Sequence, residues 1–159
     1  MRVGLLAALC ACGTAVCGSS ARAQSNNVRI TGLSDVTLGS LSGASDTKIA
    51  QNVCAFSSTA TKGYYVTASG PASGPLVLTN GGSNLPYEVQ WNGSSGQSSG
   101  TNLGANVQVG GFTSTATQQQ CSNGPTTSAS LIVIVRAGSA ASAAGGNYSG
   151  TLTLILGPE

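Results

Sequence analysis

Hydrophobic and polar residues alternate along several short stretches of the chain, and clusters of Gly, Ser, Asn and Pro separate these stretches. A period of two puts alternate side chains on opposite faces of a β-strand, and turn residues end it. In the clearest case, residues 85–91, one face carries Leu85, Tyr87, Val89 and Trp91. Similar patterns predict strands at residues 28–38, 49–56, 63–68, 76–79, 103–112, 131–136 and 148–156.

No stretch of the chain predicts a helix. Ser, Thr, Asn and Gly disfavour helices because they compete for backbone hydrogen bonds or carry excess backbone freedom. The alanine-rich residues 137–146 contain three glycines and are predicted as a loop, and residues 92–101 and 113–128 are predicted as polar loops. About eight short strands without a helix predict an all-β fold in which two sheets pack as a sandwich.

The N-terminus has the layout of a secretory signal peptide. Arg2 precedes an apolar stretch at residues 3–16, and small residues follow up to an A-x-A site that predicts cleavage between Ala23 and Gln24. This stretch is too short to span a bilayer comfortably, and no later segment approaches the required length. We therefore expect a signal peptide at residues 1–23, one secreted domain at residues 24–159 and no membrane span in the mature chain.

Five cysteines are present, and three of them, Cys10, Cys12 and Cys17, leave with the signal. The alternative to cleavage after Ala23 is a lipoprotein, in which one of these three cysteines accepts a lipid. The run of small residues that usually precedes such a cysteine is missing before each of them. The mature chain keeps Cys54 and Cys121. A pair in an exported domain predicts a disulfide, and two buried free thiols are the alternative.

Charge and histidine content exclude several classes of function. The mature chain has four basic and four acidic residues, so its net charge is zero and it offers no basic patch for nucleic acid. The absence of histidine removes the usual general base and the commonest metal ligand. Asp35 and Asp46 are the only conceivable carboxylate pair, for catalysis or calcium, and solvated turn residues are the alternative. We expect no enzyme, metal or cofactor.

Aromatic residues suggest one further candidate surface. Trp91 and the loop at residues 92–101 would form the contact surface of a self-complete extracellular module that binds carbohydrate or another surface. The alternation around Trp91 favours the other interpretation, in which the ring packs in the core.

The last predicted strand carries a recognisable motif. Residues 146–156, with Tyr148 and Ser149 before alternating leucine and threonine, resemble the closing strand of the spore coat protein U family. The members of this family are secreted subunits of chaperone–usher pili. Shorter landmarks resemble the family in the same order, at residues 36–39, 53–54, 63–66 and 85–89.

The resemblance implies an immunoglobulin-like sandwich that lacks its final strand. Leu152, Leu154 and Leu156 would form the edge that receives a strand, first from a periplasmic chaperone and, after the usher, from a neighbouring pilus subunit. It implies a structural or adhesive subunit that passes through the periplasm to a cell-surface fibre. Only four residues of the mature chain precede Val28. Either residues 28–31 act as the donor strand, or the protein ends a fibre or stands alone.

Overall fold

A computed structural model describes residues 26–159. The predicted signal peptide, with its cleavage between Ala23 and Gln24 and its three cysteines, lies outside these residues. The elements are β1 (Val28–Thr31), β2 (Thr47–Ser57), β3 (Gly63–Ser69), a 3-10 turn (Pro71–Ser73), β4 (Val77–Asn80), β5 (Ser83–Pro86), β6 (Glu88–Asn92), β7 (Thr101–Leu103), β8 (Gln108–Thr113), β9 (Ala129–Val135), α1 (Ala137–Ser142) and β10 (Thr153–Pro158).

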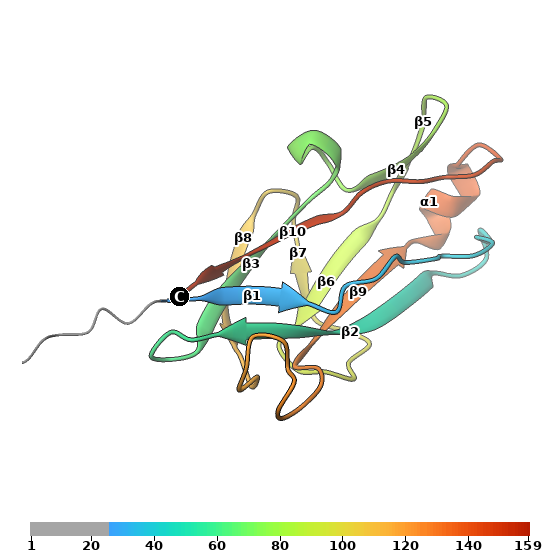
Figure 1. Cartoon of the computed structure of the whole chain (residues 1–159). Helices are drawn as coiled ribbons and strands as arrows, with labels where there is room; N and C mark the ends of the chain where they lie inside the picture. The colour runs from blue at the N-terminus through green and yellow to red at the C-terminus, as the bar shows by residue number, and fades with distance from the viewer. Residues whose placement is uncertain (1–25) are drawn as a thin grey trace, which may run out of the picture.

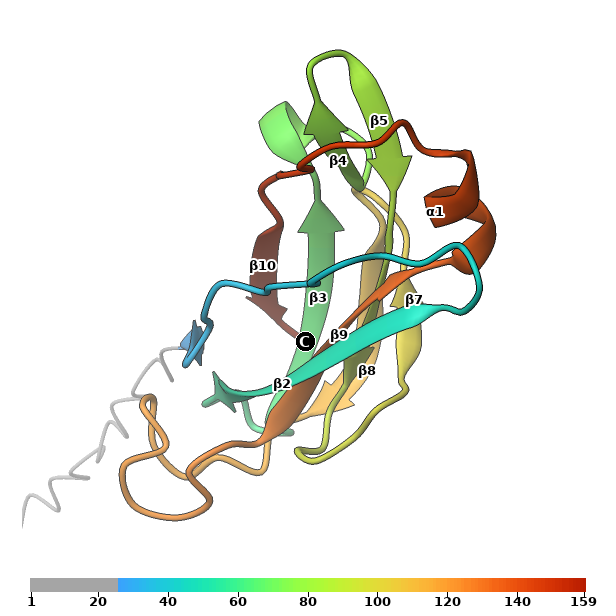
Figure 2. The same cartoon turned by 90° about the vertical axis from the view of Figure 1, so that its right-hand side faces the viewer.

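All strand ladders are antiparallel, and they form two main sheets and a hairpin (Figure 1, Figure 2). One sheet has five strands in the order β1-β2-β9-β6-β7, and the other has three in the order β10-β3-β8. Strands β4 and β5 form the hairpin. The predicted all-β fold is therefore confirmed, and its sheets are antiparallel.

The core lies between the two sheets and contains the side chains that the alternation placed on the inner faces. Leu85, Tyr87, Val89 and Trp91 are all buried, whereas Glu88, between them, is partly exposed. Strand β9, in the middle of its sheet, is buried along its whole length. The alternation therefore identified the inner face correctly even where the predicted strand bounds were wrong.

The predicted loop at residues 137–146 is wrong in its first half, because Ala137–Ser142 forms α1. The carboxylate of Asp46 accepts a hydrogen bond of 2.9 Å from the backbone N–H of Ala137. This acceptor lies far away in the sequence, so local propensity did not reveal it.

Within residues 26–159, no helix is long and apolar enough to cross a membrane.

Three predicted strands are shorter than the alternation suggested. The stretch at residues 28–38 keeps only β1, because the ladder with β2 ends at Thr31 and Gly32 follows with a φ of +80°, which breaks the regular strand. The stretch at residues 103–112 divides into β7 and β8, and the stretch at residues 148–156 is regular only from Thr153 onward. In each case the apolar period continues beyond the hydrogen-bonded ladder.

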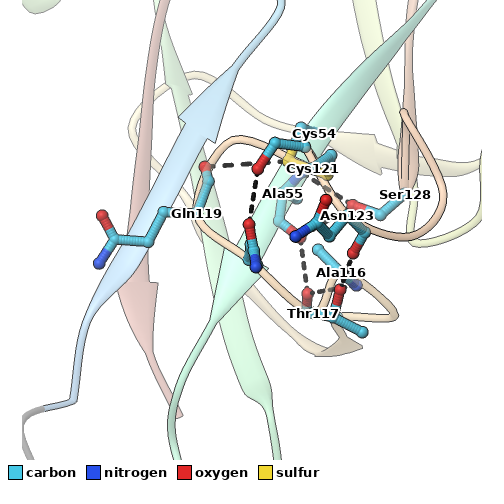
Figure 3. The surroundings of a disulfide bond; sticks show 11 residues. Cys54, Ala55, Ala116, Thr117, Gln119, Cys121, Asn123 and Ser128 are labelled. Atoms are coloured by element: carbon cyan, nitrogen blue, oxygen red, sulfur yellow. Dashed lines mark hydrogen bonds between the residues drawn. A yellow bond between two sulfur atoms is a disulfide. The ribbon is translucent and has the colours of Figure 1, made fainter.

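A disulfide joins Cys54 in β2 to Cys121 in the loop at residues 113–128 (Figure 3). Both cysteines are buried with Ala116, and Phe56 packs against them. In the same loop, the hydroxyl groups of Ser114 and Ser128 both donate to the carbonyl of Ala55. The loop therefore covers the outer face of β2 and is fixed by a covalent bond and two hydrogen bonds.

Arg136 joins the ends of three strands. Its guanidinium contacts the carboxylates of Asp46, at 2.8 Å, and Glu88, at 2.8 Å from Nε. The hydrogen bond from the Ala137 N–H and that from Arg136 lower the pKa of Asp46, and Arg136 lowers the pKa of Glu88. Because both carboxylates titrate below their ordinary values, they stabilise the fold in their charged form.

We expect the stability supplied by this cluster to be present above about pH 4.5 and lost as the pH falls through the lowered pKa values of Asp46 and Glu88. Urea unfolding at pH 7 and pH 3 measures the effect, which should be smaller in Arg136→Met than in the wild type. Arg29→Met is the control, because Arg29 has no ion-pair partner among residues 26–159. An equal pH dependence in Arg136→Met would contradict the prediction.

Candidate functional site

Strand β10 lies at the edge of its sheet and is hydrogen-bonded only to β3 among the described strands. Leu152, Leu154 and Leu156 are half-buried and pack against the core. Ile155 points to the opposite face and is 55% exposed. The strand therefore has an apolar inner face and one backbone edge without a ladder.

Residues 33–41, the lip segment, run between β10 and β2 in Figure 1. Val36, Leu38 and Leu41 pack against the core, whereas Leu33 is 45% exposed. Although the segment packs like a strand, it forms no backbone ladder with any residue of the described chain. A second backbone edge therefore runs near that of β10.

Between these two edges lies a groove of about 350 Å³, the edge groove. It is lined by Leu33, Ser34, Asp35, Val36, Leu38, Gln51, Leu78, Tyr87, Leu131, Val133, Gly150, Thr151, Leu152 and Leu154. A hollow of about 870 Å³ continues toward α1 and shares Asp35, Val36, Leu38, Leu78 and Gly150 with it. The side chains that line the edge groove are mainly aliphatic, and among the described residues Asp35 is the only charged one that lines either space.

Gln51 is the one amide in the wall of the edge groove. It shares the inner face of β2 with Ile49 and Val53, where the alternation calls for an apolar residue. Its Oε1 accepts hydrogen bonds from the Ser34 N–H, at 3.1 Å, and from the Ser34 hydroxyl, at 3.0 Å. Its Nε2 donates to the Ser34 carbonyl at 3.3 Å. Gln51 thus holds the lip segment by its backbone.

The sequence predicted Leu152, Leu154 and Leu156 as a strand-receiving edge, and the structure places the first two in the lining of the edge groove and Leu156 in β10 outside it. Sequence reasoning missed Gln51 and the lip segment. A signal for Gln51 was available, since a single polar residue interrupts the apolar face at positions 49, 51 and 53. No sequence signal marked the lip segment as unpaired, because its alternation is that of an ordinary strand.

The interpretation of Trp91 as a contact-surface residue is wrong. Its side chain is 0% exposed, and the indole Nε1 donates to the hydroxyl of Tyr64 at 3.1 Å. The two rings meet edge to face, with centroids 6.4 Å apart. The alternative interpretation, that Trp91 packs in the core, is confirmed.

The carboxylate pair considered from the sequence is divided between two environments. Asp46 is bonded to Arg136 and to the backbone of Ala137, whereas Asp35 lines the edge groove. Within residues 26–159, no three His, Cys, Asp or Glu side chains are grouped so that they could hold a metal ion. The edge groove therefore has the chemistry of an apolar binding surface between two backbone edges.

The segment considered as a donor strand is occupied within its own chain. Val28–Thr31 forms β1 and pairs with residues 54–57 of β2. On its other side it lies next to β10, without a ladder between the two strands. The segment could therefore enter another molecule only after leaving β2.

Comparison with known proteins found similarity in structure but none in sequence. No protein-family profile matches the sequence, and no curated protein sequence matches it. Among solved structures, the chain is similar to the P pilus rod subunit PapA. The two share 13% sequence identity with a TM-score of 0.49, over 91% of this chain and 98% of PapA.

Proposed function

We propose that this protein is a secreted subunit of a cell-surface fibre and that its edge groove receives a β-strand from another polypeptide. The observation that carries the proposal is the pair of backbone edges, β10 and the lip segment, on either side of an aliphatic floor. The spore coat protein U motifs, and with them an immunoglobulin-like sandwich without its final strand, support the same function. The role is structural or adhesive, without catalysis.

The physical basis is that a strand edge presents N–H and C=O groups that a further strand can bond. An added strand would gain backbone hydrogen bonds and place every second side chain on the floor of the groove. Leu152 and Leu154 supply that floor from one side and Leu131 and Val133 from another. A strand with alternating apolar residues therefore complements the edge groove.

The partners are those that the resemblance to the spore coat protein U family implies. In the periplasm a chaperone supplies the strand, and at the usher a neighbouring subunit replaces it. Because Val28–Thr31 is paired with β2, the chain donates this segment only if β1 detaches. A subunit whose β1 stays in place accepts a strand without giving one and belongs at the end of a fibre.

Binding of a synthetic strand to residues 24–159 tests the proposal. The probe is an end-capped peptide in which four valines alternate with four threonines between terminal lysines, and its control has the same composition with the valines contiguous. In a fluorescence titration we expect the alternating peptide to bind and the control peptide not to bind. Chromatography with light scattering, without a chaperone, records the oligomeric state.

Two substitutions on one strand locate the binding. Leu154→Asp places a charge on the apolar floor and should lower the affinity for the alternating peptide by about 100-fold or more. Ile155→Asp is the matched control, because Ile155 faces away from the groove and is exposed, and it should change the affinity by less than about threefold. A soluble, cooperatively unfolding monomer that binds no peptide would instead indicate a self-complete module.

A further inference from the structure

We propose that Gln51 is a positioning residue that keeps the edge groove open. This inference rests on the proposed function and adds how the groove is held ready for a strand. Within residues 26–159, the only hydrogen bonds to the backbone of the lip segment come from the Gln51 amide, and all of them are made at Ser34. Gln51 therefore supplies the backbone hydrogen bonds that hold the segment against β2, beside the packing of its apolar side chains on the core.

The hydrogen bonds between Gln51 and Ser34 also fix which backbone groups face the groove. In an extended chain, the N–H and C=O of successive residues point to opposite sides. The N–H and C=O of Ser34 both point to Gln51 on β2. We infer that those of Asp35, which also lines the edge groove, point the other way and are open to an incoming strand. An incoming strand would find its first hydrogen-bonding partner on the lip segment at Asp35.

The neighbouring apolar residues explain why an amide is useful at position 51. Leu33 lines the groove and is 45% exposed, so it gains by moving onto the aliphatic surface of Leu152 and Leu154. Such a movement would close the groove from within the chain. The three hydrogen bonds between Gln51 and Ser34 are made only while the lip segment stays in the open position, so they oppose this movement.

The test compares strand-peptide affinity in three variants with the wild type. Gln51→Met keeps the length of the side chain but removes every bond to Ser34, and we expect about tenfold weaker binding, because the open fraction falls. Gln51→Glu keeps the acceptor for the Ser34 N–H but loses the donor to the Ser34 carbonyl. Its peptide affinity should lie between those of the wild type and Gln51→Met. Gln90→Met is the control, because the Gln90 Oε1 likewise accepts a hydrogen bond from a backbone N–H, that of Gly100, away from the groove.

A double variant separates positioning from a structural defect. Leu33→Ser removes the apolar side chain that would close the groove, so Leu33→Ser/Gln51→Met should recover most of the lost affinity. Thermal unfolding should show Gln51→Met at least as stable as Gln90→Met. Hydrogen exchange should show the Ser34 amide protected in the wild type and not in Gln51→Met.

The outcomes distinguish this inference from the proposed function. If wild type and Gln51→Met bind the peptide equally, or if Leu33→Ser fails to restore binding, the positioning role is overturned and the strand-accepting groove stands. If the wild type itself binds no peptide, the proposed function fails, and the positioning role fails with it.

Discussion

Loss of the Cys54–Cys121 disulfide is expected to lower the free energy of unfolding by about 4 kcal/mol. The bond closes a loop with a sequence separation of 67 residues, and the chain-entropy model assigns about that value to a loop of this length. Domains are stable by only about 5–15 kcal/mol, so the loss is a large share of the total. Guanidinium unfolding with and without a reductant measures it.

The double variant Cys54→Ala/Cys121→Ala supplies the control for this experiment. It should lose about as much stability as the reduced wild type, and the reductant should not change it further. The same reduction should make the loop at residues 113–128 sensitive to proteolysis, because that loop lies on the outer face of β2. If the guanidinium midpoint of the wild type is the same with and without the reductant, the prediction is contradicted.

Trp91→Ala is expected to destabilise the protein by about 3–5 kcal/mol, the usual range for truncation of a buried tryptophan. The side chain is 0% exposed, and its indole is the hydrogen-bond donor to Tyr64. Trp91→Phe keeps much of the packing but leaves the Tyr64 hydroxyl without that donor, at a cost of about 1–3 kcal/mol. Denaturant unfolding of the two variants measures both effects.

Tyr148→Phe is the matched control for the Trp91 variants. The Tyr148 hydroxyl donates to the carbonyl of Ala144 near the surface, so its removal should cost about 0.5 kcal/mol or less. A Trp91→Ala protein with normal stability and altered glycan binding would contradict the buried position of this side chain and return Trp91 to the surface.

In the lip segment, the alternation of apolar and polar residues predicts which side chains are buried but not whether the backbone is paired. At Val36 and Leu38, the sequence correctly indicated side chains that face the core, but it also implied a paired strand there, and the structure has none. Alternation records which side chains are inward, because burial acts on side chains. It does not record whether a backbone edge has a neighbour.

By itself, the sequence determined the all-β class and the inner faces of the strands, and it favoured a buried position for Trp91, because these depend on short periods along the chain. Only the tertiary structure decided that α1 begins at Ala137, where Asp46 accepts the first N–H, and that Gln51 bonds Ser34. It also decided that β10 and the lip segment leave a groove between them. These features depend on contacts between distant residues, and local patterns do not encode which distant groups meet.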